Sequence, residues 1–286
     1  MKKILIVLPL YNDWKSAEHL LNKINRFFFK DNVDIQILIV NDNSSEISSL
    51  KKKKYSKIKK IETLNLKENV GSQKAIFIGL KWILKKKIKT TIVVMDSDGE
   101  DDYSKLKELI KKTEMVNKVV FAKRTKRREN IAFLFLNQIR LFVTFIITGK
   151  YLNIGNFSAF SSKLLNKILS NNNISIAYCS GVIKNLKKVD YYGVKKSKRY
   201  FGNSKVNTIF IIKHSINLIS VFYKEILLRS IFFLFGFSVI FNNSKTIYSI
   251  SVFVILINLI FLFSNFINIS KSKKLIYNIK NVVKIK

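Results

Sequence analysis

The sequence predicts an α/β protein with a mainly parallel sheet, helices on both faces of the sheet, and a C-terminal pair of apolar helices. Three observations carry this prediction. Short apolar runs alternate with amphipathic stretches over the first two-thirds of the chain, an acidic cluster at 96–102 directly follows one such run, and residues 247–269 carry no charge. Alternating strands and helices favour parallel strands joined by crossovers over the two faces.

The individual elements follow from the apolar pattern. Short runs rich in β-branched residues predict strands over residues 4–8, 34–40, 61–66, 90–95 and 119–122. Amphipathic spacing predicts helices over residues 16–29, 72–84 and 104–113. Ser72 is expected to be the N-cap of the second helix, because its hydroxyl can accept a hydrogen bond from a backbone N–H of the first turn.

The composition narrows the class of protein. Lys and Arg number 52 against 18 Asp and Glu, a formal charge of +34, which favours an anionic partner or membrane surface. Part of this excess accompanies a general richness in Lys, Ile and Asn, as AT-rich coding DNA produces. Cys179 is the only cysteine, so a disulfide within the chain is excluded, and two histidines are too few for a histidine-based metal site.

The last third resembles a membrane segment. Residues 247–269 are long enough to span a bilayer, and residues 221–241 reach that length only by including Lys224, Glu225 and Arg229. We therefore expect a spanning helical hairpin whose lysine-rich flanks both lie in the cytoplasm. A buried core helix is the alternative for 247–269. Residues 131–148 form a further apolar helix, either interfacial or buried.

The acidic cluster is the most informative stretch for function. Asp96 and Asp98 directly follow a predicted buried strand. Ligands of open α/β sheets bind at the carboxyl ends of strands. Two carboxylates one residue apart suit a hard divalent cation such as Mg²⁺, which shares its remaining positions with water and substrate phosphates. The alternative is a solvated acidic turn.

Three other motifs fall at the same edge of the predicted sheet. Pro9-Leu10-Tyr11-Asn12 ends the first strand, Asp42-Asn43-Ser44-Ser45 ends the second, and Asn69-Val70-Gly71-Ser72 opens a helix. A nucleotide laid across this edge would touch each of them.

This pattern resembles the family 2 glycosyltransferases, which have the Rossmann-like GT-A fold. Within that family it is similar to the branch of dolichyl-phosphate mannose synthases and bacterial polyprenyl-phosphate glucosyltransferases. The branch also has an Arg-x-x-Gly-x-Ser-Lys motif, here residues 199–205, and several members carry a C-terminal pair of spanning helices. The resemblance covers about residues 3–205.

The resemblance implies a role for each motif residue. The nucleotide would be bound by Pro9, Tyr11, Asn12, Asp42, Gly71, Lys74 and Asp96. A Mg²⁺ or Mn²⁺ ion would be held by Asp96, Asp98 and Glu100. Catalysis would rest on Asp98, Arg199 and Lys205, and the acceptor would be bound by Asn156, Arg199, Ser204 and Lys205. Asn156 and Ser158 stand where the branch often has an acid and a base, which favours a phosphate as acceptor.

The implied function is inverting transfer of a hexose from a nucleotide sugar to polyprenyl phosphate at the cytoplasmic leaflet of the inner membrane. The implied division is a glycosyltransferase domain (1–205), an interfacial connector (206–225), a spanning helix pair (226–270) and a basic cytoplasmic tail (271–286). Homo-oligomers through the spanning helices are possible, and nucleic acid is not expected as a partner. The alternatives are an acceptor that is a lipid-linked saccharide, and a non-enzymatic basic protein bound to the membrane.

Overall fold

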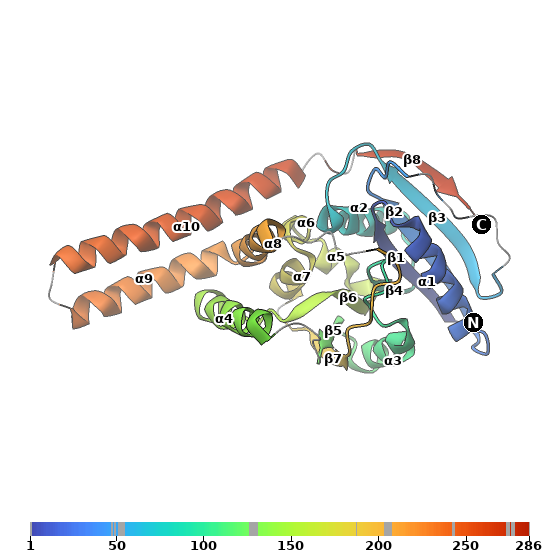
Figure 1. Ribbon diagram of the computed structural model, residues 1–286, viewed down its shortest axis with the longest axis horizontal. Coiled ribbons are helices and arrows are strands. Elements are labelled where there is room, and N and C mark those ends of the chain that lie inside the picture. The colour runs from blue at the N-terminus through green and yellow to red at the C-terminus, as the bar shows by residue number, and fades with distance from the viewer. Residues whose placement is uncertain are drawn as a thin grey trace.

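The computed structural model describes residues 2–46, 48, 50, 55–125, 131–186, 188–202, 208–241, 244–272, 275 and 278–285. Within these residues an eight-stranded sheet forms the centre of the α/β domain (Figure 1). Its strands lie in the order β7 (Asp190–Val194), β5 (Val120–Arg124), β6 (Ile154–Ser161), β4 (Thr91–Val94), β1 (Lys2–Leu10), β2 (Val33–Asn41), β3 (Ile58–Leu66) and β8 (Ile279–Lys284).

The pairing confirms a mainly parallel sheet. β1 is parallel to β2 and β4, β2 is parallel to β3, and β5 is parallel to β7. Two strands run the other way: β6 lies antiparallel between β4 and β5, and β8 is antiparallel to β3. All five predicted strands are present, whereas β6, β7 and β8 were not predicted.

Helices cover both faces of the sheet because its central strands are apolar on both sides. In β1, Ile4, Ile6 and Leu8 face one core, which includes α1 (Trp14–Phe27) and α3 (Leu106–Val116). Leu5 and Val7 face the other core. That core contains residues of α2 (Ser72–Lys85), α5 (Leu165–Ile168), α6 (Asn173–Ile176) and α7 (Tyr178–Leu186).

The C-terminal helices form the predicted hairpin. After α8 (Thr208–Ser220), the helices α9 (Tyr223–Ile240) and α10 (Ser244–Ser272) run side by side in opposite directions and project away from the sheet (Figure 1). Among the described helices, α10 alone is long and apolar enough to cross a membrane, by length and composition. A second crossing by α9 therefore stays a prediction.

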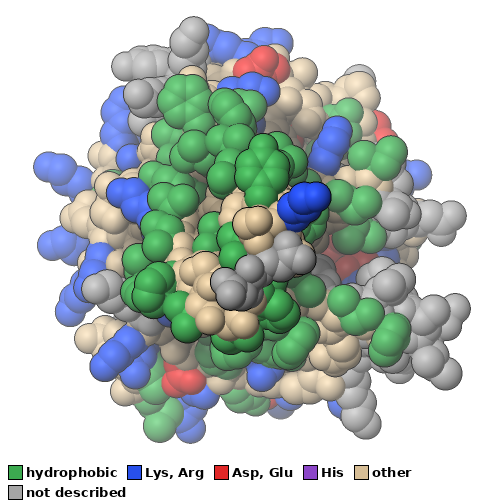
Figure 2. All heavy atoms as spheres, turned by 90° about the vertical axis from the view of Figure 1, so that its left-hand side faces the viewer, with side chains coloured by type: hydrophobic (Ala, Val, Ile, Leu, Met, Phe, Trp, Pro, Cys, Tyr) green, Lys and Arg blue, Asp and Glu red, His purple; other side chains and the backbone are tan. Residues whose placement is uncertain are grey.

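The hairpin is not a buried core element. Phe253 and Phe266 of α10 are 63% and 70% exposed, and Phe232 of α9 is 66% exposed. Figure 2 looks along the hairpin from its tip, and hydrophobic side chains gather over the centre of this face. The alternative of a core helix for residues 247–269 is therefore wrong.

The apolar helix α4 (Ile131–Thr148) lies beside the base of α9. Its Phe142 is 65% exposed whereas Leu141 is 1% exposed, so α4 is buried on one side only. Arg229 of α9 donates from Nη1 to the carbonyl oxygen of Ile146 at 3.3 Å, at the C-terminal end of α4. The negative end of a helix dipole stabilises such a cation, so the exposed guanidinium of Arg229 is stabilised by the C-terminal end of α4.

The segment predicted to be a basic tail, 271–286, contains the last strand of the sheet. Residues 279–284 form β8, which returns to the sheet and pairs with β3 from Glu62–Lys284 to Leu66–Ile279. The hairpin is thus tied to the α/β domain at both of its ends.

Candidate active site

A cavity of about 190 Å³ lies at the carboxyl ends of β1, β2 and β4. It is lined by Pro9, Leu10, Tyr11, Asp13, Asp42, Ser72, Asp96, Ser97, Asp98 and Arg199. Residues from five separate sequence motifs therefore meet in one place. A larger hollow of about 900 Å³, lined by Lys3, Thr90 and Thr91 among others, lies at the opposite edge of the sheet.

The loops after β1 and β2 are bound to each other beside this cavity. The backbone N–H of Asn12 donates to Ser44 Oγ at 2.9 Å, and Asn12 Nδ2 donates to Ser45 Oγ at 3.1 Å. Asn12 has a φ of 48°, in the left-handed region that asparagine tolerates better than most residues. This conformation turns the chain from the end of β1 toward α1.

Asp42 holds the start of α2. Its Oδ1 accepts from the backbone N–H of Val70 at 2.7 Å and its Oδ2 accepts from that of Gly71 at 2.8 Å. Gly71, with a φ of 86°, is the N-cap of α2, so the prediction of Ser72 as N-cap is wrong by one residue. Burial raises the pKa of the Asp42 carboxyl, and the two backbone hydrogen bonds oppose that rise.

Lys74 lies in the first turn of α2, half-buried near Asp42. Burial lowers the pKa of the Lys74 ammonium, and the nearby charge of Lys271, in the last turn of α10, lowers it further. The C-terminal end of the apolar hairpin therefore lies close to the helix that borders the cavity.

The acidic cluster follows β4 as predicted. Asp96 accepts from Asn156 Nδ2 at 3.2 Å, and its backbone N–H donates to Asp101 Oδ2 at 2.9 Å. Asp98 accepts from the backbone N–H of Glu100 at 2.9 Å. Burial, followed by repulsion from Asp96, raises the pKa of Asp98 to about 6. The cluster thus places an excess of negative charge where little water reaches it.

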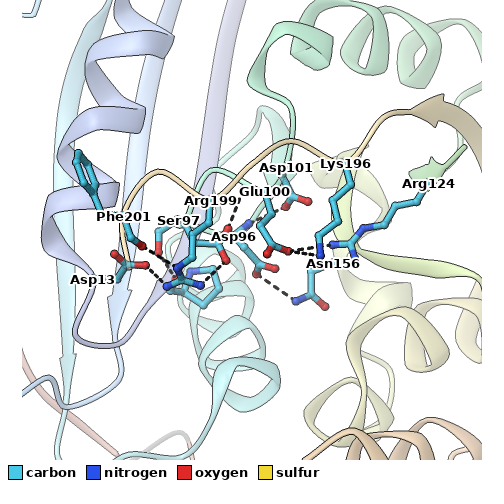
Figure 3. Close-up of polar contacts among 12 residues, drawn as sticks. Asp13, Asp96, Ser97, Glu100, Asp101, Arg124, Asn156, Lys196, Arg199 and Phe201 are labelled. Carbon is cyan, nitrogen blue, oxygen red and sulfur yellow. Dashed lines mark hydrogen bonds and ion pairs between the residues drawn. The ribbon is translucent and has the colours of Figure 1, made fainter. Parts of the chain in front are cut away.

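The guanidinium of Arg199 balances part of this negative charge (Figure 3). Its Nη1 lies 3.0 Å from Asp98 Oδ2, and its Nη2 lies 2.5 Å from Asp13 Oδ2. The segment that carries Arg199 runs across the cluster, with the backbone N–H of Ser197 donating to the Glu100 carbonyl at 3.0 Å and that of Tyr200 donating to the Asp98 carbonyl at 3.0 Å. Arg199 was predicted from its motif, whereas Asp13 was not.

The three predicted metal ligands do not gather into one group. Glu100 Oε2 lies 3.1 Å from Lys196 Nζ and 3.9 Å from Arg124 Nη2 (Figure 3). Across the described part of the chain, no cluster of three or more His, Cys, Asp or Glu side chains is arranged to hold a metal ion. Asp96 and Asp98 do line the same cavity, and two carboxylates fit Mg²⁺ when substrate phosphates complete its shell.

Asn156, predicted to bind the acceptor, joins α2 to the acidic cluster. Its Oδ1 accepts from Gln73 Nε2 at 3.2 Å, while its Nδ2 donates to Asp96. Gln73 Oε1 accepts in turn from the backbone N–H of Tyr178 at 2.7 Å. The predicted acceptor residues Ser204 and Lys205 lie outside the described residues.

A family model, glycosyl transferase family 2, matches residues 5–186, which include the cavity-lining carboxylates Asp42, Asp96 and Asp98. The chain belongs to this family. Two curated relatives are uncharacterized glycosyltransferases: YkcC of Bacillus subtilis, 28% identical over 129 residues, and a protein of Synechocystis, 26% identical over 125 residues. These matches cover 45% and 43% of this chain but only 39% and 38% of the relatives, so the chain spans about two-fifths of their length.

Among solved structures, this family 2 glycosyltransferase is similar to glucosyl-3-phosphoglycerate synthase from Mycobacterium tuberculosis, solved with uridine diphosphate. The TM-score is 0.50 at 14% identity, over 79% of this chain and 80% of that one. The likeness confirms the predicted GT-A fold and nothing finer.

Several site residues of this glycosyltransferase were not predicted. Asp13, Gln73 and Lys196 all take part in the hydrogen bonds and ion pairs around the acidic cluster. Asp13 directly follows the Asn12 motif, and Gln73 directly follows Ser72, so proximity to a motif was the available signal. Lys196 stands three residues before Arg199 in a lysine-rich stretch and has no distinguishing signal in the sequence.

Proposed function

We propose that this glycosyltransferase binds a nucleotide sugar in the cavity at the carboxyl ends of β1, β2 and β4, and transfers the sugar with inversion to polyprenyl phosphate. The observation that carries the proposal is the shared cavity: Asp96 and Asp98 supply carboxylate oxygens and Arg199 supplies a guanidinium beside them. Carboxylates and a guanidinium at the same edge of the sheet suit a ligand that carries phosphate groups together with a bound cation.

On the donor side, the chain's own groups position the nucleotide. Asp42 fixes the turn at Val70 and Gly71, and the bound loops around Asn12 and Ser44 form the neighbouring wall. A bound Mg²⁺ or Mn²⁺ would stabilise negative charge on the departing nucleoside diphosphate. Asp96 and Asp98 would hold that ion, and Glu100 remains with Lys196 and Arg124.

On the acceptor side, a lipid phosphate is already an anion near neutral pH. It needs orientation and charge neutralisation rather than a strong base. Arg199 can contact a phosphate through two nitrogens of its planar guanidinium. Once Arg199 turns from Asp98 toward a phosphate, Asp98 is released to the donor side of the cavity.

The hairpin supports the membrane location. α10 has 29 residues, about 44 Å of helix, and α9 has 18 residues, about 27 Å, against a hydrocarbon core of about 30 Å. The chain leaves the sheet after β7 and returns to it as β8. It therefore crosses a bilayer an even number of times, so if α10 spans the membrane, α9 spans it too.

The same hairpin directs the acceptor to the site. Exposed aromatic and aliphatic side chains on α4 and α9, such as Phe142, Phe145 and Phe232, suit contact with lipid tails. Lysine-rich segments beside the domain suit an anionic leaflet, which carries the lipid phosphate. The catalytic domain then lies on the cytoplasmic side, where nucleotide sugars are made available.

The test combines binding and transfer with the full chain in detergent or vesicles. Labelled UDP-, GDP- and dTDP-sugars are supplied with Mg²⁺ or Mn²⁺ and undecaprenyl phosphate, and the lipid product is tested for release by mild acid, as expected of a sugar phosphodiester. A protein that binds a nucleotide sugar but transfers no sugar to undecaprenyl phosphate would favour a lipid-linked saccharide as acceptor. No divalent-dependent affinity for any nucleotide sugar would contradict the proposal.

A matched pair of variants locates the activity. Asp98→Asn is expected to lower transfer by about 100-fold or more, roughly 3 kcal/mol, with the protein still in the membrane fraction. Glu114→Gln changes an exposed carboxylate that pairs with Lys2 and should leave transfer unchanged. Equal transfer in both variants would show that the site lies elsewhere.

A further inference from the structure

Three asparagines lie side by side across the strands β2, β3 and β8. Asn41 is the register partner of Asn65, and Asn65 is the register partner of Asn281. Asn41 Nδ2 donates to Asn65 Oδ1 at 2.8 Å, and Asn65 Nδ2 donates to Asn281 Oδ1 at 2.7 Å. These side chains form a continuous ladder from the outermost strand, β8, to the end of β2.

One backbone group fixes the direction of this asparagine ladder. The N–H of Ser44 donates to Asn41 Oδ1 at 3.1 Å. A backbone N–H can only donate, so Asn41 must turn its oxygen to Ser44 and its NH₂ group to Asn65. Asn65 then presents its oxygen to Asn41 and its NH₂ group to Asn281, which is left to act as the acceptor.

The inner end of the ladder lies next to a segment that lines the cavity. Ser44, held by Asn41, accepts through Oγ from the backbone N–H of Asn12 at 2.9 Å. Asp42, which lies between Asn41 and Ser44 in the chain, lines the cavity itself. The conformation of the loop at residues 41–45 therefore depends on hydrogen bonds that continue outward to β8.

The outer end of the ladder belongs to the strand that follows the apolar hairpin. β8 forms the edge of the sheet next to β3 (Figure 1), and the backbone N–H of Lys67 donates to the carbonyl of Asn278 at 2.8 Å. The strand is thus held in register where α10 ends. Asn281 is exposed, so the core does not explain an asparagine at this position.

We propose that Asn281 is a positioning residue for the donor site. Through Asn65 and Asn41 it fixes the conformation of the loop at residues 41–45, which binds the nucleotide. The strand β8, which follows the hairpin in the chain, thereby contributes to the shape of the pocket. This inference rests on the proposed function, in which the cavity receives a nucleotide sugar. Asn281 touches no substrate and acts only through the ladder.

The test measures donor KM and kcat separately in the full-length protein. Asn281→Leu removes the acceptor and should raise the donor KM about five- to tenfold while kcat changes less than twofold. Asn281→Asp keeps an acceptor oxygen and should retain the KM of the parent protein. Lys280→Leu, on the same exposed strand, is the matched control and should leave both constants unchanged.

A double variant tests the direction of the ladder. Asn65→Asp alone should leave the donor KM unchanged, because Asn281 at the free end can turn its NH₂ group toward the new carboxylate. Asn65→Asp combined with Asn281→Asp places two acceptors face to face, and should raise KM at least as much as Asn281→Leu does. Such non-additivity identifies a direct contact.

The outcomes separate this inference from the function on which it rests. If the parent protein binds no nucleotide sugar, the proposed function fails. If the parent binds its donor and Asn281→Leu has the same KM, the positioning role is overturned. A fall of kcat and thermal stability together, without a change of KM, would show that Asn281 only holds β8 in place, and would also overturn it.

Discussion

Arg199 and Asp98 form an ion pair directly across the cavity, with Arg199 Nη1 3.0 Å from Asp98 Oδ2. The pair is shielded, since the two side chains are 22% and 19% exposed. The cavity measures about 190 Å³ in this arrangement, whereas small-molecule sites typically occupy about 300–1,000 Å³. We therefore expect Arg199 to move away from Asp98 when a nucleotide sugar enters.

Breaking this pair should expose Asp98 to cations. In Arg199→Met, we expect Mn²⁺ to bind about three- to tenfold more tightly, because no ion pair has to be broken first. Transfer should fall sharply, because the guanidinium is lost. Lys196→Met, which removes a partner of Glu100 rather than of Asp98, is the control. Mn²⁺ titration by electron paramagnetic resonance checks this, and equal affinity in parent and Arg199→Met would contradict it.

Gly99 should tolerate no side chain. It has a φ of 89°, and a Cβ at this position would overlap the ring of Tyr200, whose segment carries Arg199. Gly99→Ala should therefore combine backbone strain with displacement of that segment, and lower both thermal stability and transfer. Gly202→Ala is the control, because Gly202 has a φ of 68° with open space around it and adds only strain, about 1–2 kcal/mol.

A variant that also changes Tyr200 separates the steric clash with its ring from the backbone strain at residue 99. Gly99→Ala combined with Tyr200→Ala removes the ring, so stability should recover to about the level of Gly202→Ala. A double variant that unfolds at the same temperature as Gly99→Ala would show that the ring is not the cause.

Asp42 should not be replaceable by asparagine. Its two oxygens accept from two part-buried backbone N–H groups. In asparagine one of these oxygens is an NH₂ group, which would face a donor and leave it unpaired, at a cost of up to about 1–3 kcal/mol. Asp102 accepts a single backbone N–H, from Ser104, and asparagine caps equally well there. Thermal unfolding should therefore show a loss in Asp42→Asn and almost none in Asp102→Asn. Equal losses would contradict this assignment.

The two ends of α10 should lie on opposite sides of the membrane. Single cysteines are introduced at Lys245, where α10 begins, and at Lys280 in β8, in a Cys179→Ser background that removes the buried native thiol. An impermeant maleimide added to spheroplasts should label position 245 but reach position 280 only after permeabilisation. Labelling of both from one side would rule out the crossing by α10.

The spacing of apolar residues and the sequence motifs were enough to predict much of the fold and of the candidate site. The bounds of α4 agree with the predicted 131–148 because an apolar stretch ends at Gly149, which has a φ of 69°. The motifs around Pro9, Asp42 and Asp98 meet in one cavity, because parallel strands bring their carboxyl ends to the same edge.

The unpredicted parts depend on contacts between distant residues. β6 contains polar residues such as Asn156 and Ser158, which interrupt the apolar run that would predict a strand. It forms a strand because it pairs with β4 on one side and with β5 on the other. β8 has only exposed or partly exposed residues and is defined by its pairing with β3. The contact of Asp13 with Arg199 joins residues 186 positions apart, a separation at which no local pattern operates.

The return of the chain to the sheet also sets an order of assembly during biosynthesis. Because β8 follows α10 in the chain, the ribosome makes the whole hairpin before it makes the last strand of the sheet. The edge of β3 stays uncovered until then. Insertion of only one helix of the hairpin would leave β8 across the bilayer from β3, so such a molecule would keep an incomplete sheet and an open edge that quality-control proteases could recognise.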